Sequence, residues 1–271
     1  MLSLAVGPFA LSLHHLLILL ALGLASLVGW QLARKGFGSN PEALIFRLFL
    51  LCLVVARGAF VLRYWAQYRQ DLWQIPDIRD GGFLLWPGLA VSGLTALVYA
   101  WRRPLIRRTL GWSLASGLLF WTLASVGSHG YQQARHSQLP EVTLNTATGQ
   151  PVALRSYGGK PMIINLWASW CPPCRREMPV LLEMQKLHPE VRFLFVNHGE
   201  TAQIVASFAG TTGLDLTQVL FDSQGELGRA LGSVALPTTL FYSSEGKLLG
   251  SHLGELSKAS LQHALETFPT Q

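Results

Sequence analysis

Four long apolar stretches fill the first half of the chain. They cover about residues 11–33, 43–62, 83–101 and 109–128, and each approaches the roughly 20 apolar residues that a transmembrane helix needs. A secretory signal peptide does not explain the first stretch, because a basic segment before it and a small-residue cleavage site after it are both missing. We therefore expect residues 1–135 to form an all-α membrane domain of about four transmembrane helices.

The second half shows shorter patterns, in which strand-like and helix-like segments follow each other. Residues 141–144 and 151–154 alternate around a turn-forming segment and predict a hairpin. Residues 129–140, before the hairpin, lose the apolar pattern and are expected to form a short polar tether. The order of the elements predicts an α/β fold over residues 136–271, with a central sheet flanked by helices. Further strands are expected at 162–168, 191–196, 218–221, 239–242 and 247–252, and helices at 171–187 with an interruption near Pro179, 201–209, 224–231 and 257–268.

Positive charge is concentrated in the apolar half. Residues 1–136 hold 12 Lys and Arg against 4 Asp and Glu, a net charge of +8, whereas residues 137–271 have a net charge of −2. The short loops at Arg34-Lys35 and 101–108 carry much of this charge and are expected to face the cytoplasm. The basic balance thus indicates membrane topology and no nucleic-acid partner. It places residues 136–271 in the periplasm of a multi-pass protein of the bacterial inner membrane, where disulfide chemistry is possible.

A Cys-Pro-Pro-Cys motif follows the strand predicted at 162–168 and opens the next predicted helix. The first turn of a helix offers free N–H groups and a positive dipole end, which stabilise a thiolate. Cys171 is therefore expected to be an accessible nucleophile, and Cys174, one turn further on the same helix face, the residue that resolves a mixed disulfide.

Two other interpretations of this motif are a zinc site and an inert structural disulfide. Zinc needs four ligands, and the sequence has no second Cys or His pair at similar spacing. A Cys-x-x-Cys between a strand and a helix is instead typical of redox proteins. We therefore expect no metal and no cofactor other than a redox-active Cys171–Cys174 disulfide.

Residues 138–271 resemble the TlpA-like, membrane-tethered branch of the thioredoxin superfamily, which includes reductants of the ResA and CcmG types. The resemblance is carried by Gly159–Pro179 around the dithiol, by Phe221-Asp222, by Leu236–Tyr242 and by 245–247. It implies a thioredoxin-like fold and a protein-disulfide reductase that acts on protein disulfides and receives electrons from a membrane donor of the CcdA/DsbD type. Apocytochromes, lipoproteins and copper-handling proteins are the client classes left open, as are oxidase and isomerase activities.

The resemblance also assigns roles near Pro237. In that family the corresponding proline is cis and lies against the dithiol, so Pro237 joins the expected catalytic set. The backbone at Leu236 and Thr238 is then expected to bind an extended substrate. A trans turn proline is the other interpretation, since cis X-Pro bonds are uncommon.

Polar and aromatic residues near the dithiol have both a functional and a structural interpretation. Glu177 matches a buried glutamate of the family, which would raise the thiol pKa values by like-charge repulsion and favour a reductant. A solvated glutamate on the helix is the alternative. Asn165 stands where cytosolic thioredoxins carry a buried aspartate. Trp170 is expected to form a platform for the substrate, with a packing role as the alternative.

The first 130 residues resemble the N-terminal part of prolipoprotein diacylglyceryl transferase. The resemblance rests on Gly7-Pro8, 31–35, 56–64 and 81–89. Trp86-Pro-Gly-Leu stands where that family has His-Gly-Gly-Leu, so the acid/base histidine is lost and lipid transfer is not expected. The region could still serve as a scaffold that binds membrane lipid or a partner. The alternative to the reductase is therefore a lipid- or lipoprotein-binding membrane module that carries an accessory thioredoxin domain. Arg57, inside the second stretch, either has a role there or extends to the interface.

Overall fold

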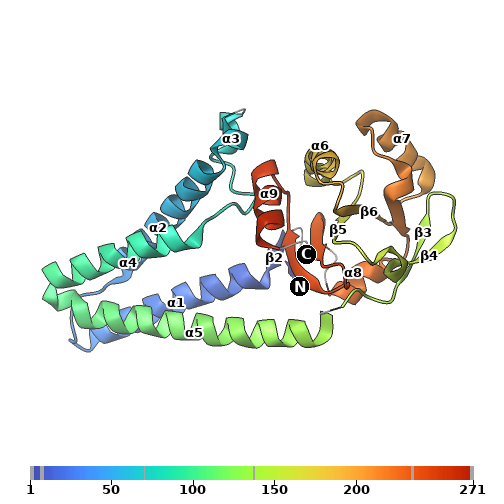
Figure 1. Ribbon diagram of the computed structural model, residues 1–271. Coiled ribbons are helices and arrows are strands. Elements are labelled where there is room, and N and C mark those ends of the chain that lie inside the picture. Colours follow the sequence, from blue (N-terminus) through green and yellow to red (C-terminus); the bar gives the residue numbers. More distant parts are fainter. Residues whose placement is uncertain (1–2, 7–8, 70, 137, 233–234, 269–271) are drawn as a thin grey trace. The chain divides into compact units, whose positions relative to one another are not determined.

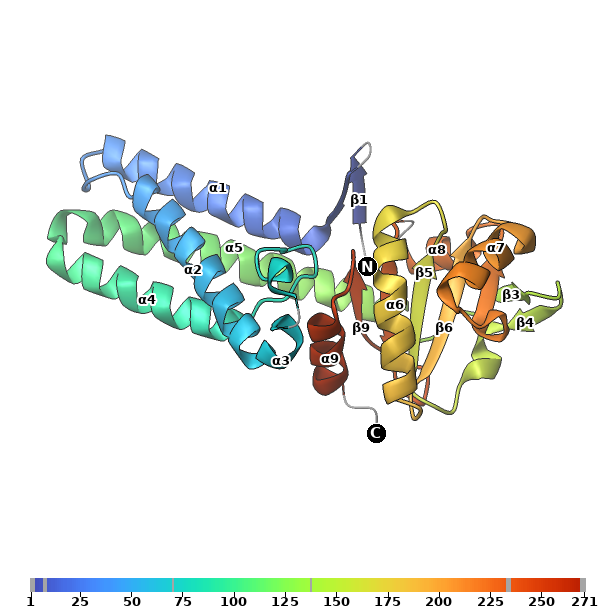
Figure 2. The same ribbon diagram turned by 90° about the horizontal axis from the view of Figure 1, so that it is seen from above.

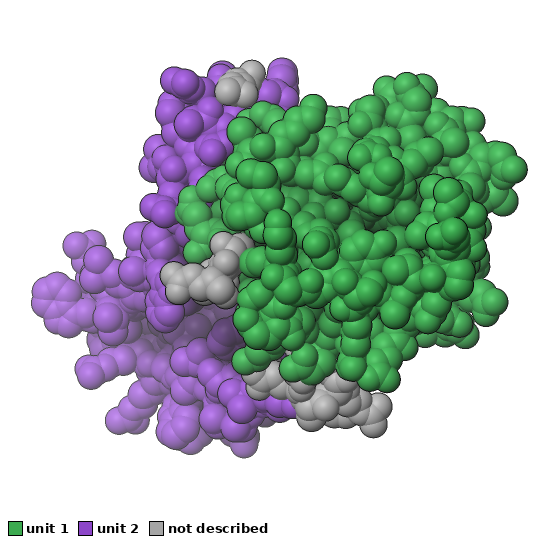
Figure 3. Space-filling view, turned by 45° about the vertical axis from the view of Figure 1, so that its right-hand side comes forward, with its two compact units in different colours: residues 1–12, 77–81, 132–271 green, residues 13–76, 82–131 purple. Residues whose placement is uncertain are grey.

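The computed structural model describes the chain except for residues 1–2, 7–8, 70, 137, 233–234 and 269–271 (Figure 1). The chain divides into two compact units (Figure 3). Unit 1 comprises residues 1–12, 77–81 and 132–271, and unit 2 comprises residues 13–76 and 82–131.

Unit 2 is built from helices that coincide with the four apolar stretches. These are α1 (Leu13–Arg34), α2 (Glu42–Arg63), α4 (Leu85–Arg102) and α5 (Pro104–His136), with the short α3 (Trp65–Tyr68) and η1 (Leu72–Gln74) between α2 and α4. Among the described residues, α1, α2 and the Pro104–Ser128 part of α5 are long and apolar enough to cross a membrane. The expected apolar helical region is thus confirmed, whereas α4 does not meet the same criterion of length and composition.

Close packing of α2 against α4 depends on a glycine. A Cβ atom added at Gly88 would lie 2.5 Å from the carbonyl oxygen of Cys52 and 3.1 Å from the Cβ atom of Ala56. Small residues at such positions let helix backbones approach closely in membranes.

Two predictions for the first half need correction. The segment from 129 to 136, expected to be a polar tether, continues α5 as far as His136. The first helix begins at Leu13 rather than at 11, because β1 (Ser3–Val6) and β2 (Phe9–Ser12) pair as an antiparallel hairpin before it.

Unit 1 contains a seven-stranded sheet in its described part, with the strand order β4-β3-β7-β6-β5-β8-β9. Strands β5, β6 and β7 are parallel, and the outer strands pair antiparallel. The strands are β3 (Thr143–Thr146), β4 (Pro151–Ala153), β5 (Met162–Trp167), β6 (Arg192–His198), β7 (Val219–Asp222), β8 (Thr238–Tyr242) and β9 (Leu248–Leu253). The helices are α6 (Pro172–Leu187), α7 (Ala202–Thr212), α8 (Glu226–Leu231) and α9 (Lys258–Thr267), with η2 (Leu154–Tyr157) and η3 (Leu216–Gln218).

The central strand β5 is buried along its whole length. Because side chains alternate between the faces of a sheet, Ile163 and Trp167 enter the core formed with α6, α7 and α9. Ile164 and Leu166 enter the core on the other face, to which α8 contributes. Burial on both faces explains why β5 is a continuous apolar run rather than an alternating one, and Figure 2 shows α6 running alongside β5 and β6.

The elements predicted for residues 141–268 are all present, so the α/β thioredoxin-like fold is confirmed. One detail is wrong, because α6 runs through Pro179 without interruption. Proline removes one helical hydrogen bond, and Met178 and Leu181, both fully buried beside it, keep the helix packed on the sheet.

Candidate functional site

The dithiol lies at the junction between β5 and α6. Cys171 is the N-cap of α6, its sulfur accepts a hydrogen bond from the Cys174 N–H at 3.3 Å, and Pro172 and Pro173 occupy the first helical positions. The two cysteines form a disulfide with an S–S distance of 2.05 Å. Cys171 is only 3% exposed and Cys174 is fully buried, so the expected accessible nucleophile is covered in this oxidised state.

Glu177 is buried on the same helix, three residues after Cys174. Its Oε1 accepts a hydrogen bond from Asn165 Nδ2 at 2.8 Å, and its Oε2 accepts one from the Leu256 N–H at 3.1 Å. Burial raises the pKa of Glu177 to about 8, although both hydrogen bonds oppose this rise by favouring the charged form. Of the two interpretations of this residue, the structure therefore supports the buried carboxyl.

Asn165 connects Glu177 to the sheet. Its Nδ2 also donates to Thr239 Oγ1 at 3.0 Å, whereas its Oδ1 has no hydrogen-bond partner among the described atoms. If the amide is turned over, Oδ1 faces Glu177 and accepts a hydrogen bond from the neutral carboxyl. The same side chain can thus serve both protonation states of Glu177.

The segment around Pro237 lies at the same sheet edge as the dithiol. Thr238 pairs with Leu166 in the β5–β8 ladder, which puts Pro237 level with the end of β5. The Leu236–Pro237 peptide bond is cis, as the resemblance implies. Leu236 is half-buried, whereas Thr238 is buried and its hydroxyl donates to the Ala235 carbonyl oxygen at 2.6 Å.

The two tryptophans near the dithiol have different environments. Trp167 is fully buried and its ring lies 5.1 Å from that of Phe208, so it is a packing residue. Trp170 is 65% exposed directly before Cys171, which leaves its ring available to a partner.

Two residues that the sequence did not single out, Glu200 and Ser169, contact each other just before the dithiol. Glu200 accepts hydrogen bonds from Ser169, in the loop before Cys171, and from Asn197 in β6. The available signal was topological, because residues that follow adjacent parallel strands meet at one sheet edge. Glu200 follows β6 as Ser169 follows β5.

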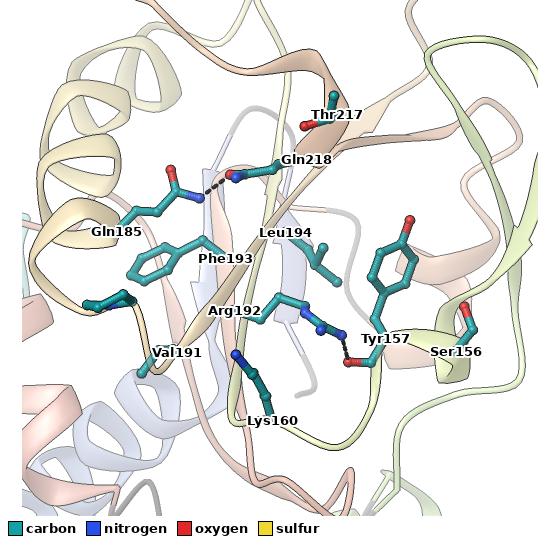
Figure 4. A pocket seen from close by; sticks show the side chains of 11 residues that line it. Ser156, Tyr157, Lys160, Gln185, Val191, Arg192, Phe193, Leu194, Thr217 and Gln218 are labelled. Atoms are coloured by element: carbon teal, nitrogen blue, oxygen red, sulfur yellow. Dashed lines mark hydrogen bonds between the residues drawn. The ribbon is translucent and has the colours of Figure 1, made fainter.

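A cavity of about 610 Å³ lies at the opposite end of the parallel strands (Figure 4). Lys160 precedes β5 and Arg192 begins β6, and both side chains line the cavity together with Tyr157. The Arg192 guanidinium donates to the Tyr157 carbonyl oxygen. Because Cys171 follows the carboxyl end of β5, this cavity is not part of the dithiol site.

Arg57 in unit 2 holds the segment between α2 and α4. Its guanidinium donates to the carbonyl oxygens of Gln74, Ile75 and Gly82 at 2.9, 3.0 and 2.9 Å, and the residue is 8% exposed. It therefore ties the segment between α2 and α4 together. Among the described residues, no group of three or more His, Cys, Asp or Glu side chains is placed to hold a metal ion.

Comparison with known proteins gives matches for both halves of the chain. Residues 134–265 match the Redoxin family model, and residues 1–123 match that of prolipoprotein diacylglyceryl transferase. The thiol-disulfide oxidoreductase ResA of Geobacillus thermodenitrificans is 33% identical over 133 residues, which are 48% of this chain and 76% of ResA. The thioredoxin-like protein YneN of Bacillus subtilis is 31% identical over 134 residues, 48% of this chain and 77% of YneN.

Among solved structures, that of MTB dsbF in its mixed oxidized and reduced forms aligns with 48% of this chain and 99% of its own length, at 25% identity and a TM-score of 0.45. The sequence relatives show the family, and residues 134–265, which match the Redoxin model, include the dithiol and the sheet that positions it. The chain belongs to the ResA-type thiol-disulfide oxidoreductases, and it carries in addition an N-terminal region that matches prolipoprotein diacylglyceryl transferase.

Proposed function

We propose that the chain is a membrane-anchored protein-disulfide reductase whose thioredoxin-like part works on the outer side of the bacterial inner membrane. The observation that carries the proposal is the buried Glu177 on the helix face of Cys174, with its pKa raised to about 8. The buried surroundings that disfavour the charged carboxyl also disfavour negative charge on the neighbouring sulfurs, so they disfavour thiolates. A dithiol with raised pKa values gives up its electrons more readily than one with stabilised thiolates.

The reaction begins with the reduced dithiol. The Cys171 thiolate attacks one sulfur of a client disulfide, which forms a mixed disulfide and releases the first client thiolate. Cys174 loses its proton and attacks the Cys171 sulfur, which releases the second client thiolate and closes the Cys171–Cys174 disulfide. Two electrons pass to the client, and protonation of its two sulfurs completes the transfer.

Glu177 has two parts in this scheme. At neutral pH a carboxyl with a pKa of about 8 is mostly protonated, and its ionised fraction can take the proton that Cys174 gives up. Above about pH 8 it is charged and opposes the thiolates by like-charge repulsion. Pro237 and the backbone at Leu236 and Thr238 would flank the client, and Trp170 would supply an exposed aromatic surface beside the reacting sulfur.

Electrons must return to the oxidised dithiol from a donor. A membrane protein of the CcdA/DsbD type fits this need, because the compartment outside the cytoplasm offers disulfide-forming rather than reducing conditions. The helices of unit 2 would anchor the enzyme in membrane lipid, with Arg34-Lys35 and the arginines of 101–108 on the cytoplasmic side. Reporter fusions at the C-terminus test this topology, and a cytosolic signal would overturn it.

Two experiments test the reductase itself. The Cys174→Ser variant cannot resolve the mixed disulfide, so it should accumulate clients bound to Cys171, while a Cys171→Ser variant should trap none. A redox titration of the purified full chain should give a potential at or below about −200 mV. A value near that of a strong oxidant, about −120 mV, would identify an oxidase instead.

A further inference from the structure

We infer that Glu200 is a positioning residue of the dithiol site, which holds the loop that presents Cys171 to its partners. The inference deepens the proposed function, because it rests on Cys171 being the attacking sulfur. Glu200 itself has no part in the sulfur exchange. It acts on the chain through Ser169, two residues before Cys171.

The Glu200 carboxylate accepts hydrogen bonds from two segments, the loop after β5 and the end of β6. We call this set of contacts the clamp. Glu200 Oε2 accepts from the Ser169 N–H at 2.7 Å and from Asn197 Nδ2 at 2.7 Å, and Oε1 accepts from the Ser169 hydroxyl at 2.5 Å. The Glu200 N–H donates back to Asn197 Oδ1 at 3.3 Å. Hydrogen bonds to an ionised carboxylate are about twice as strong as neutral ones, so these contacts hold Ser169 firmly in place.

The clamp has a rigid base. Asn197 lies in β6 opposite Trp167, the last residue of β5, and is 1% exposed. Gly199 then turns the chain with φ of 75°, a left-handed conformation that favours glycine. This turn brings Glu200 back over the end of β5, where it meets Ser169.

The loop is also anchored at Ala168, which is fully buried and whose carbonyl oxygen accepts from the Cys171 N–H at 3.2 Å. Residues 168–170 form no helix or strand, and Trp170 is 65% exposed between the clamped Ser169 and Cys171. A loop fixed on one side of Cys171 and a helix on the other define the direction from which a client sulfur can approach. Misplacement by about 1 Å can cost about 100-fold in rate when a reaction needs an aligned attack.

The experiment compares Glu200→Ala with Glu200→Gln in the reduced full chain. In the glutamine variant the amide oxygen can accept from both Oε2 donors and the amide N–H can donate to the Ser169 hydroxyl, so the position is kept and the charge lost. Glu245→Gln, at an exposed glutamate in the turn before β9, is the matched control. Two quantities are measured: kcat/KM for insulin reduction with dithiothreitol as electron source, and the pH midpoint of Cys171 alkylation, followed by mass spectrometry of its peptide.

We expect Glu200→Ala to lower kcat/KM by about 10- to 100-fold and to shift the pH midpoint of alkylation by more than Glu200→Gln does, because both variants lose the charge and only Glu200→Ala also loses the contacts that position the loop before Cys171. The glutamine variant should stay close to the parental chain, and the control should equal it. A variant that merely unfolds in part would lose kcat but keep the midpoint of its folded fraction. Unchanged values in Glu200→Ala, or equal losses in Glu200→Gln and Glu200→Ala, would overturn the inference.

A parental chain that fails to reduce insulin would count against the proposed function, whereas the alkylation midpoints would still test the clamp. If Glu200→Ala does not fold, Ser169→Ala takes its place, since it removes only the hydroxyl contact and keeps the one from the Ser169 N–H. Its expected loss in kcat/KM is about 2- to 10-fold, the value of one hydrogen bond. Parental kinetics and an unshifted midpoint in Ser169→Ala would then contradict the inference.

Discussion

Replacing Glu177 by glutamine should remove most of the pH dependence of the free energy of unfolding of unit 1, which contains the dithiol. The native carboxyl is buried and has a pKa of about 8, against an ordinary value of 4.5. Between these values the native chain holds a proton that the unfolded chain has lost, so the free energy of unfolding falls as the pH rises. The contribution of the neutral carboxyl is complete below pH 4.5 and is lost by about pH 8.

The size of the effect follows from the same two values. One pKa unit corresponds to about 1.4 kcal/mol, so the interval from 4.5 to about 8 amounts to about 5 kcal/mol at most. Glutamine resembles the neutral carboxyl in shape and cannot ionise. The Glu177→Gln variant should therefore match the parental chain at about pH 5 and exceed it in stability by several kcal/mol at about pH 8.

Hydrogen exchange of the oxidised full chain is a suitable assay. Peptides from β5 and α6 report the opening free energy of the unit that contains Glu177, after correction for the intrinsic exchange rate at each pH. Glu245→Gln, an exposed replacement in the same unit, controls for the loss of one carboxylate. Parallel pH curves for the parental chain and Glu177→Gln would refute the reasoning, because no buried carboxyl would then be titrating in this range.

Three further predictions concern other contacts. Asn165→Ala should raise the pKa of Glu177 above about 8, since it removes a hydrogen bond that favours the charged form; infrared titration of the carboxyl band measures it. Gly88→Ala should destabilise unit 2 by about 1 to 3 kcal/mol, whereas Gly93→Ala, with no atom within 4 Å of the added Cβ, should not; thermal unfolding in detergent compares them. Arg57→Lys, which cannot reproduce three donors in a planar fork, should cost about 2 to 4 kcal/mol in the same assay.

Local patterns explain what the sequence predicts well. The apolar run from Met162 to Trp167 is a strand buried on both faces, and the dithiol directly after it marks the start of a helix. The order of strands and helices then leads to the fold, because each element is defined by residues within a short window. The family resemblance supplied Glu177 and Pro237, which composition and spacing alone do not distinguish from ordinary helix and turn residues.

The features that could not be predicted from the sequence depend on contacts between residues far apart in the chain. The Ser169–Glu200 contact joins residues 31 positions apart, and nothing near either residue indicates the other. Helix α6 continues through Pro179 because buried neighbours on both sides outweigh one lost hydrogen bond. The covering of Cys171 likewise arises from packing around the sheet edge, which a pattern of single residues does not contain.

The low exposure of the joined sulfurs has a consequence for how the enzyme is recharged. A thiol, whether free or on a protein, meets sulfur surface only at Cys171, since Cys171 is 3% exposed and Cys174 is fully buried. The attack of a reductant is thus directed at Cys171, and the rate of recharging depends on how far this sulfur becomes accessible during the encounter. In the proposed reaction a mixed disulfide with the electron donor would therefore form at Cys171, the same sulfur that attacks the client.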